Sequence, residues 1–151
     1  MFEMLKLSDT MESAIVFEET IMEIWKAHQN EELRFKLHNG VDDLLWGNKN
    51  RALDTFTEVV KEDPDYAEAW NKASTCHYLL GDMQSSLEAA ERTLELLPRH
   101  FQAMNGLGLV HYETQRYELA ARFFRQSLTL DPWSPVSARL AACKDILHDV
   151  D

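Results

Sequence analysis

The sequence predicts an all-α protein made of repeated pairs of antiparallel helices. Pro64, Pro98 and Pro132 are each 34 residues apart, and other residues recur at the same interval. Only 5 glycines and 4 prolines occur among 151 residues. That is too few for a β-sandwich, which turns about every ten residues. A chain of this length corresponds to one domain, because a second one would be too small to keep its own core.

Four further columns of residues keep this interval. They are Gly40, Ser74 and Gly108; Ala52, Ser86 and Ala120; Phe56, Ala90 and Phe124; and Val60, Leu94 and Leu128. The two columns of small residues indicate close helix crossings, because a large side chain there would cost about 1–3 kcal/mol of overpacking. Each proline is expected just after the second helix of a pair, because it disfavours α geometry in the residue before it. Gly47 and Gly81 are expected at turns within the pairs, where a residue with positive φ ends a helix.

On these residues the chain resembles the tetratricopeptide repeat (TPR) family, whose pattern is W-x2-L-G-x2-Y…A-x3-F…P. The first repeat matches least, because Lys36, Asn39 and Asp43 stand where the pattern has Trp, Leu and Tyr. The resemblance implies an α-solenoid, the TPR superhelix, which by itself names no ligand. It places the three repeats at residues 33–66, 67–100 and 101–134.

A helix is expected before the first repeat, over residues 9–28, with Asp9 and Glu12 as its capping box. Two apolar stripes lie at helical spacing: Ala14, Phe17, Ile21 and Ile24, and beside them Met11, Ile15, Met22 and Trp25. Two stripes indicate burial on more than one side, so the helix either covers the first repeat or meets a partner. We expect residues 9–32 to cover the first repeat, because a terminal repeat needs a helix over its open face. Residues 1–8 are then an N-terminal extension.

The other end of the chain predicts a matching capping helix within residues 135–151. It should run from Pro135 to about His148, with an inward face of Val136, Leu140, Cys143 and Leu147. With the three repeats, this makes eight helices.

The resemblance also implies where a partner would bind. In the TPR family the first helix of each pair lines a concave groove, and its fifth, ninth and twelfth positions face the ligand. The candidate groove residues are Leu37, Val41, Asn71, Thr75, Tyr78, Asn105, Leu109 and Tyr112. Asparagines at one position of consecutive repeats can hold a peptide backbone through bidentate amide bonds. The two tyrosines either cover apolar side chains of a ligand or pack between neighbouring helices.

One specialised use of the family can be compared position by position. The clamp of Hsp70/Hsp90 co-chaperones holds two carboxylates with lysines, asparagines and an arginine. The corresponding positions here are Leu37, Val41, Lys72, Gln102 and Gly106. None of them matches, so a terminal carboxylate would meet apolar side chains where it needs cations. The sequence therefore predicts that the protein is not a carboxylate-clamp co-chaperone.

The charge of the chain narrows the class of partner. It has 15 basic and 26 acidic residues, a net charge of −11, which disfavours binding to nucleic acid or to an anionic membrane. Residues 1–66 carry −8 of this charge. A basic protein partner would be steered there, although the same charge also suits a solvated helical surface. We expect a protein or peptide ligand, no nucleic acid, no membrane, and a monomer or weak homodimer.

Nothing in the sequence predicts catalysis. Cys76 and Cys143 have no metal-ligand or disulfide pattern and are expected as buried thiols. His77 and His111 stand one repeat apart, but stacked helices lie about 8–10 Å apart, too far to share a zinc ion. No phosphate loop, HExxH, GxSxG or CxxC motif occurs. We expect no enzyme, no cofactor and no metal, and a soluble protein of a reducing compartment, cytoplasmic with an organelle still open.

The functional expectation is a non-enzymatic adaptor that holds a peptide or helix of a partner in the TPR groove. The alternative is a structural or assembly-factor subunit of a larger complex, held through its end helices and convex face.

Overall fold

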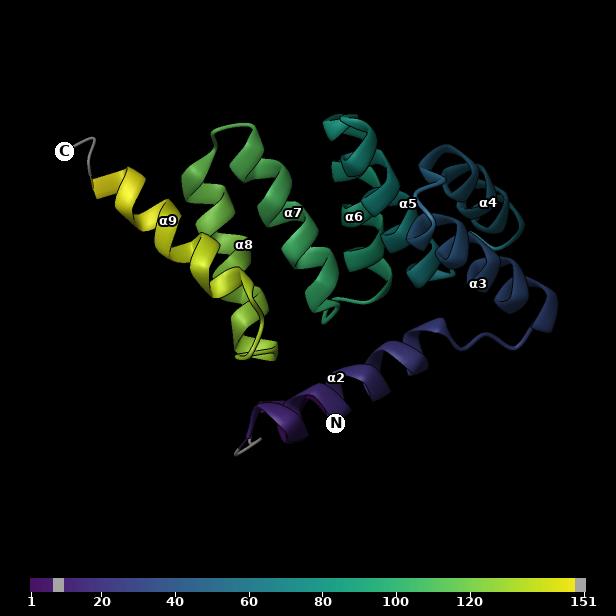
Figure 1. The fold of residues 1–151 in the computed structure, drawn as a ribbon, viewed down its shortest axis with the longest axis horizontal. Coiled ribbons are helices and arrows are strands. Elements are labelled where there is room, and N and C mark those ends of the chain that lie inside the picture. Colours follow the sequence, from purple (N-terminus) through teal and green to yellow (C-terminus); the bar gives the residue numbers. More distant parts are fainter. Residues whose placement is uncertain (7–9, 149–151) are drawn as a thin grey trace. The chain divides into compact units, whose positions relative to one another are not determined.

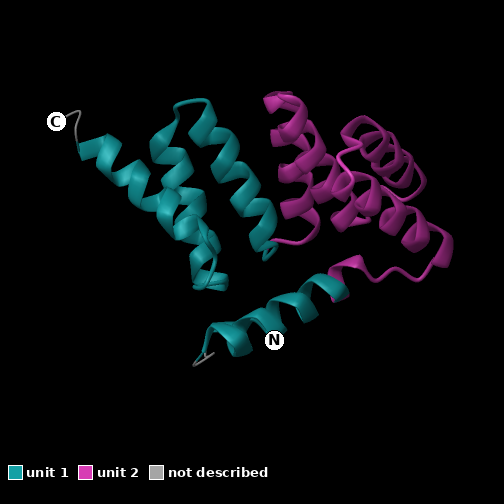
Figure 2. Cartoon of the chain, viewed as in Figure 1, with its two compact units in different colours: residues 1–23, 99–151 teal, residues 24–98 magenta. Residues whose placement is uncertain are grey.

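A computed structural model of the chain describes residues 1–6 and 10–148, which contain nine α-helices and no strand (Figure 1). The helices are α1 (Phe2–Lys6), α2 (Met11–Lys26), α3 (Glu31–Leu45), α4 (Lys49–Glu62), α5 (Ala67–Leu80), α6 (Met83–Leu96), α7 (Phe101–Glu113), α8 (Tyr117–Leu130) and α9 (Val136–His148). The short α1 is additional to the eight helices that the sequence predicts. The chain divides into two compact units, residues 1–23 with 99–151, and residues 24–98 (Figure 2).

The unit of residues 24–98 contains two antiparallel helix pairs, α3 with α4 and α5 with α6, and α4 also packs against α5. Its core is formed by buried apolar side chains of α3, α4 and α5, among them Leu37, Phe56, Val59 and Cys76. These residues lie on one face of each helix, as the 34-residue pattern predicts. On the other side of α3, Phe35, His38, Asn39, Asp42 and Leu45 are exposed.

The columns of small residues do mark close helix crossings. A Cβ atom added to Gly40 would lie 2.6 Å from the ring of Phe56, and one added to Gly108 would lie 2.4 Å from the ring of Phe124. In the second repeat Ala90 stands at the position of Phe56 and Phe124. This smaller side chain leaves room for Ser74 at the position of the two glycines. There the Oγ atom of Ser74 donates to the carbonyl of Ser86 over 2.8 Å and ties α5 to α6.

The turns within the pairs repeat one backbone conformation. Gly47 and Gly81 have φ angles of +82° and +84°, as expected for residues that end a helix in the left-handed region. Gln115, one interval further on, adopts the same conformation with φ of +59°. The first two pairs therefore use glycine where the third uses a glutamine.

The unit of residues 1–23 and 99–151 contains the pair α7 and α8, followed by α9. Val136 and Cys143 are buried in one apolar cluster with Phe124, and Leu140 packs against it. The face predicted for the C-terminal helix is therefore the one that packs on α8. Leu147 is half-buried.

The N-terminal residues of this unit pack against the third repeat. The ring of Phe2 meets that of Phe101 edge to face at 6.5 Å, and the guanidinium of Arg99 lies 4.5 Å from the Phe2 ring centre. Further along, the side-chain amide of Gln102 donates to the sulfur of Met22.

Residues 26–28, by contrast, contact Tyr66 and Asp63 of the first repeat, and the expectation that residues 9–32 cover that repeat stays a prediction. Of the two predicted apolar stripes only Ala14 and Ile21 are buried, whereas Met11, Ile15 and Ile24 are 60%, 48% and 54% exposed.

The capping box predicted for the N-terminal helix includes Asp9, which lies outside the described residues, so it stays a prediction. At the start of α2 the hydroxyl of Thr10 accepts a hydrogen bond from the backbone N–H of Ser13 over 3.2 Å. A threonine at this place satisfies one of the free amides at the helix start.

Candidate partner-binding surfaces

The candidate groove residues all lie on the first helices of the pairs, but they differ in exposure. Those of the 24–98 unit are on α3 and α5, and those of the other unit are on α7. Leu37 and Asn71 are buried, and the remaining six are half-buried, namely Val41, Thr75, Tyr78, Asn105, Leu109 and Tyr112.

Leu37 and Asn71 belong to the interior. Leu37 is 0% exposed and is part of the apolar core between α3, α4 and α5. The Asn71 amide donates to the carboxylate of Glu68 at 3.4 Å, and Glu68 also pairs with Lys72 at 3.0 Å. The fifth position of the repeat therefore packs inward in α3 and α5. In α5 its amide holds a buried carboxylate in place, so it does not project into a ligand site.

The second residue of the predicted asparagine pair has different surroundings. The Asn105 Nδ2 atom donates to the hydroxyl of Ser134 at 3.3 Å, while its Oδ1 atom has no hydrogen-bond partner among the described residues. A buried amide oxygen without a partner is costly. Asn105 is therefore the member of the pair that still has hydrogen-bonding capacity for a ligand.

The two tyrosines also differ. Tyr112 meets Tyr117 edge to face at 5.4 Å, and the guanidinium of Arg139 lies over its ring at 5.4 Å. These contacts with α8 and α9 favour the interpretation in which this tyrosine packs between neighbouring helices. Tyr78 is half-buried at the end of α5, next to Leu79, which is 43% exposed.

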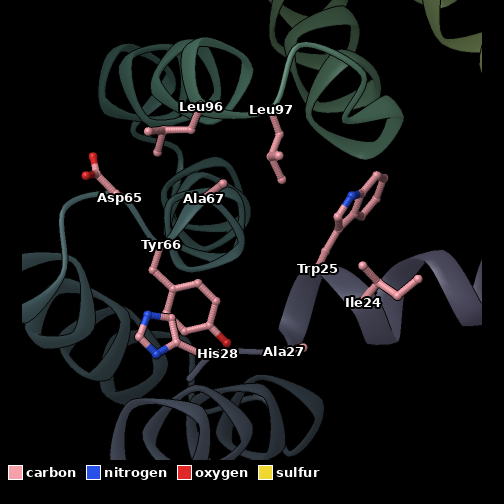
Figure 3. A pocket seen from close by; sticks show the side chains of 9 residues that line it. All are labelled: Ile24, Trp25, Ala27, His28, Asp65, Tyr66, Ala67, Leu96 and Leu97. Carbon is pink, nitrogen blue, oxygen red and sulfur yellow. The ribbon is translucent and has the colours of Figure 1, made fainter. Parts of the chain in front are cut away.

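Sequence reasoning missed a pocket in the 24–98 unit. It has a volume of about 310 Å³ and is lined by Ile24, Trp25, Ala27, His28, Asp65, Tyr66, Ala67, Leu96 and Leu97 (Figure 3). Its apolar wall comes from the end of α2 and from the end of α6. Trp25 belongs to a predicted apolar stripe, but no pattern in the sequence relates it to Tyr66, Leu96 or Leu97.

Hydrogen bonds connect the chain segments on the polar side of this pocket. The Tyr66 hydroxyl donates to the backbone carbonyl of Lys26, and burial, with the charge of Glu68, raises the pKa of Tyr66 well above its ordinary value. The His28 Nε2 atom lies 2.7 Å from the carboxylate of Asp63. The pKa of Asp63 is lowered first by the N–H of Asp65 and then by His28. These groups are thus occupied in tying residues 26–28 to the start of α5.

The thiols and the recurrent histidines have structural surroundings. Cys76 and Cys143 are free and 0% exposed, and burial raises the pKa of Cys76 to about 11. His111 is buried and stacks on Phe123 at 5.4 Å, and burial lowers its pKa. Within residues 1–6 and 10–148, no group of three or more His, Cys, Asp or Glu side chains is placed to hold a metal ion.

The same part of the chain was searched for membrane spans. None of its helices combines the length and the apolar composition that crossing a bilayer requires.

Comparisons with known proteins agree with this architecture. A TPR repeat-containing protein of Rhizobium etli is 31% identical over 81 residues, which span 54% of this chain and only 40% of that protein. The photosystem I assembly protein Ycf3 of Rippkaea orientalis is 25% identical over 142 residues, with 82% of each chain covered. The solved structure of the first TPR of Spaghetti (RPAP3), bound to the HSP90 peptide SRMEEVD, superposes with a TM-score of 0.75. It is 16% identical and covers 78% of this chain and 94% of that one.

These likenesses support an α-solenoid of antiparallel helix pairs. The family model described as tetratricopeptide repeat matches residues 47–98 and 80–135, which together make up more than half of the sequence. The chain belongs to the tetratricopeptide repeat family.

Proposed function

We propose that this protein is a non-enzymatic adaptor that binds a peptide or helix of a partner protein through the first helices of its repeats. The observation that carries the proposal is that a first helix in each unit has a half-buried, chemically mixed surface. Thr75 and Tyr78 on α5, and Asn105 and Leu109 on α7, are all partly exposed. Helices that only packed against one another would bury apolar side chains at such positions. The RPAP3 structure shows that a TPR domain of this fold can hold a peptide.

Asn105 is the polar anchor of this proposal. Its Oδ1 atom lacks a partner in the described chain, and its Nδ2 atom is held by Ser134. A small rotation of the amide would let it bond a backbone N–H of a ligand. Leu109, one turn further along α7, offers an apolar contact beside it.

The ligand is not expected to be a chaperone C-terminal carboxylate. Of the clamp positions, Leu37 is 0% exposed and Gly106 has no side chain. Lys72 is the one cation among them, and it pairs with the carboxylate of Glu68 at 3.0 Å. Without free cations a terminal carboxylate would lose its solvation and gain no compensating ion pair. The peptide SRMEEVD should therefore show no saturable binding in a calorimetric titration.

A second function is favoured by the likeness to Ycf3, which extends over 82% of each chain. In this alternative the protein is an assembly factor or a subunit held through its end helices. The exposed apolar residues of α2 fit such a contact, since Ile15 is 48% exposed and Val16 is 56% exposed.

Affinity purification with two variants distinguishes these functions. Tagged wild-type chain, Asn105→Leu and Ile15→Glu are compared by quantitative mass spectrometry of the co-purified proteins. Leucine is the residue of the first repeat at the position of Asn105, so α7 should tolerate it. The adaptor proposal predicts that Asn105→Leu loses the main partner and that Ile15→Glu keeps it. The opposite result would establish the assembly-subunit alternative and contradict the use of the groove.

A further inference from the structure

One face of α3 is exposed, whereas the counterparts of Phe35, Asn39 and Asp42 in the second and third repeats are buried. We call it the outer face of α3, and it comprises Phe35, His38, Asn39, Asp42 and Leu45, with Trp46 directly after the helix. Residues at this spacing share one side of a helix. Phe35 is 67% exposed, Leu45 is 80% exposed and Trp46 is 84% exposed. Single exposed apolar residues are normal on a protein surface, but these three large side chains lie on one side of the same helix and at its end.

The second repeat shows what this face does elsewhere in the fold. One interval of 34 residues beyond Phe35, Asn39 and Asp42 stand Ala69, Ala73 and Cys76. All three are at most 4% exposed, and they lie in one core cluster with Val59 and Val60 of α4. In α5, therefore, this face receives a neighbouring helix.

The third repeat agrees. The corresponding residues of α7 are Ala103, Leu107 and Val110, and each is 1% exposed. At these three positions the first helix is therefore buried in α5 and α7 and exposed in α3. Toward the helix end, Leu79 and Leu80, the counterparts of Leu45 and Trp46, are also 43% and 40% exposed.

The chemistry of the outer face differs from that of its buried counterparts. A depression of about 760 Å³ lies along it, lined by Glu31, Glu32, Arg34, Phe35, His38, Asn39 and Asp42. This lining contains three carboxylates and one guanidinium, and the guanidinium is 3.6 Å from Glu31. Asp42 lies between the aromatic side chains of Phe35 and Trp46 along the helix. Between its two apolar ends the surface therefore carries one carboxylate, that of Asp42, while Glu31 and Glu32 precede Phe35 and pair with Arg34 and Lys36.

We propose that the outer face of α3 is a docking site for a basic amphipathic helix of a partner protein. Phe35 at one end, and Leu45 with Trp46 at the other, contact apolar residues of that helix, and Asp42 pairs with a lysine or arginine between them. Phe35 and Trp46 are separated by roughly 16 Å along the helix axis at 1.5 Å per residue. That length corresponds to about three turns of a partner helix. Recognition of this kind uses apolar anchors at helical spacing, with charge complementarity setting the choice of partner.

The charges disfavour the other occupants. A wholly apolar helix, of the kind that covers α5, would bury the Asp42 carboxylate without a partner, which is costly. A second copy of this chain that used the same face would bring the two sets of carboxylates together. A helix with cations opposite Asp42 meets neither penalty. This proposal is independent of the groove proposed above, because Asn105 takes no part in it.

The test uses the full chain and a stapled, fluorescein-labelled 14-residue helical peptide with a leucine stripe flanked by lysines. Anisotropy titrations should show saturable binding that Phe35→Ala and Asp42→Lys each weaken by at least about tenfold, equivalent to about 1.4 kcal/mol. Two controls should leave the affinity within about twofold. Asp54→Lys makes the same charge change at an exposed site on α4, and Leu119→Ala removes an apolar side chain that is 39% exposed on α8. Circular dichroism confirms that each variant folds.

Three results would overturn the proposal. An equal loss with Asp54→Lys and Asp42→Lys would mean general charge attraction without a site. Unchanged binding by Phe35→Ala would remove the apolar anchor. A concentration-dependent dimer that Phe35→Ala abolishes would identify a second copy as the occupant. Asn105→Leu should not affect peptide binding here, so failure of the groove proposal and failure of this one are distinguishable.

Discussion

The outer face of α3 and the corresponding face of α5 occupy the same position in the repeat but have opposite surroundings. Phe35 is 67% exposed, whereas Ala69, its counterpart, is 0% exposed. The residue types follow the surroundings: α5 has small apolar side chains against α4, and α3 has an aromatic ring and a carboxylate facing solvent. A repeat therefore determines the backbone position, while the neighbour of each helix determines which side chains can stand there.

The largest expected change in the free energy of unfolding comes from placing the polar residues of the outer face of α3 at the corresponding positions of α5. Ala73→Asn combined with Cys76→Asp moves the polar residues of α3 onto α5, where both positions are at most 4% exposed. An unpaired carboxylate buried against α4 should lower the free energy of unfolding by at least about 3 kcal/mol. Urea denaturation followed by circular dichroism measures this difference.

The reverse exchange is the matched control. Asn39→Ala with Asp42→Ala alters exposed side chains, so the free energy of unfolding should stay within about 0.5 kcal/mol of wild type. Similar losses for the two double variants would show that the outer face of α3 is packed as closely as that of α5.

A smaller effect is expected from the opposite face of α3. A Cβ atom at Gly40 would lie 2.6 Å from the Phe56 ring, so Gly40→Ala should cost about 1–3 kcal/mol through overpacking. Gly106 is a helical glycine whose added Cβ meets no atom within 4 Å. Gly106→Ala should therefore stabilise the protein by about 0.5–1 kcal/mol, because alanine favours the helix. Thermal melts of the two variants should shift in opposite directions; a shift in the same direction would refute the close crossing.

The smallest effect concerns two aspartates at one repeat position, Asp63 and Asp131. The pKa of Asp63 is lowered by the N–H of Asp65 and by His28, whereas burial raises the pKa of Asp131. A lowered pKa contributes stability that is present above the unfolded value, near about pH 4, and is lost as the pH falls through the folded value. A raised pKa makes a contribution to stability of the opposite sign, so an ionised Asp131 opposes folding at neutral pH.

These signs can be checked by urea denaturation between pH 3 and pH 7. Asp63→Asn should destabilise the protein at pH 7 and have less effect at the acidic end. Asp131→Asn keeps an acceptor for the N–H of Trp133, which is 3.2 Å from the carboxylate, and should stabilise at pH 7. Equal responses of the two variants would contradict the opposite pKa directions.

Much of the fold could be predicted because packing repeats with the sequence. The interval that relates Gly40 to Gly108 predicts the helix crossings, and both glycines do contact a phenylalanine of their own pair. The inward face of the C-terminal helix followed from the spacing of Val136, Leu140 and Cys143 in the same way. Local periodicity determines which side of a helix is apolar.

What the sequence could not predict is which surface each apolar side meets. The stripes of α2 predicted burial on two sides, yet Ile15 and Ile24 are 48% and 54% exposed. The hydrogen bonds of this helix to the repeats include those from Gln102 to Met22 and from Tyr66 to the Lys26 carbonyl. The recurrence of Asn71 and Asn105 suggested one shared role, but Glu68 and Lys72 draw Asn71 into an internal network. In both cases the contacting residue is either far along the chain or at a different position of the repeat. A 34-residue pattern compares equivalent positions only, so it cannot predict such contacts.

The most direct test of the open outer face is a labelling experiment on the variant Asn39→Cys. Native Cys76 is the internal reference, because it is 0% exposed and its pKa is raised to about 11, which leaves little reactive thiolate. Alkylation resolved by mass spectrometry should modify position 39 rapidly and Cys76 only after unfolding, and the basic helical peptide should slow the reaction at position 39 alone. Equal labelling of the two thiols, or labelling of position 39 that the peptide leaves unchanged, would contradict the account.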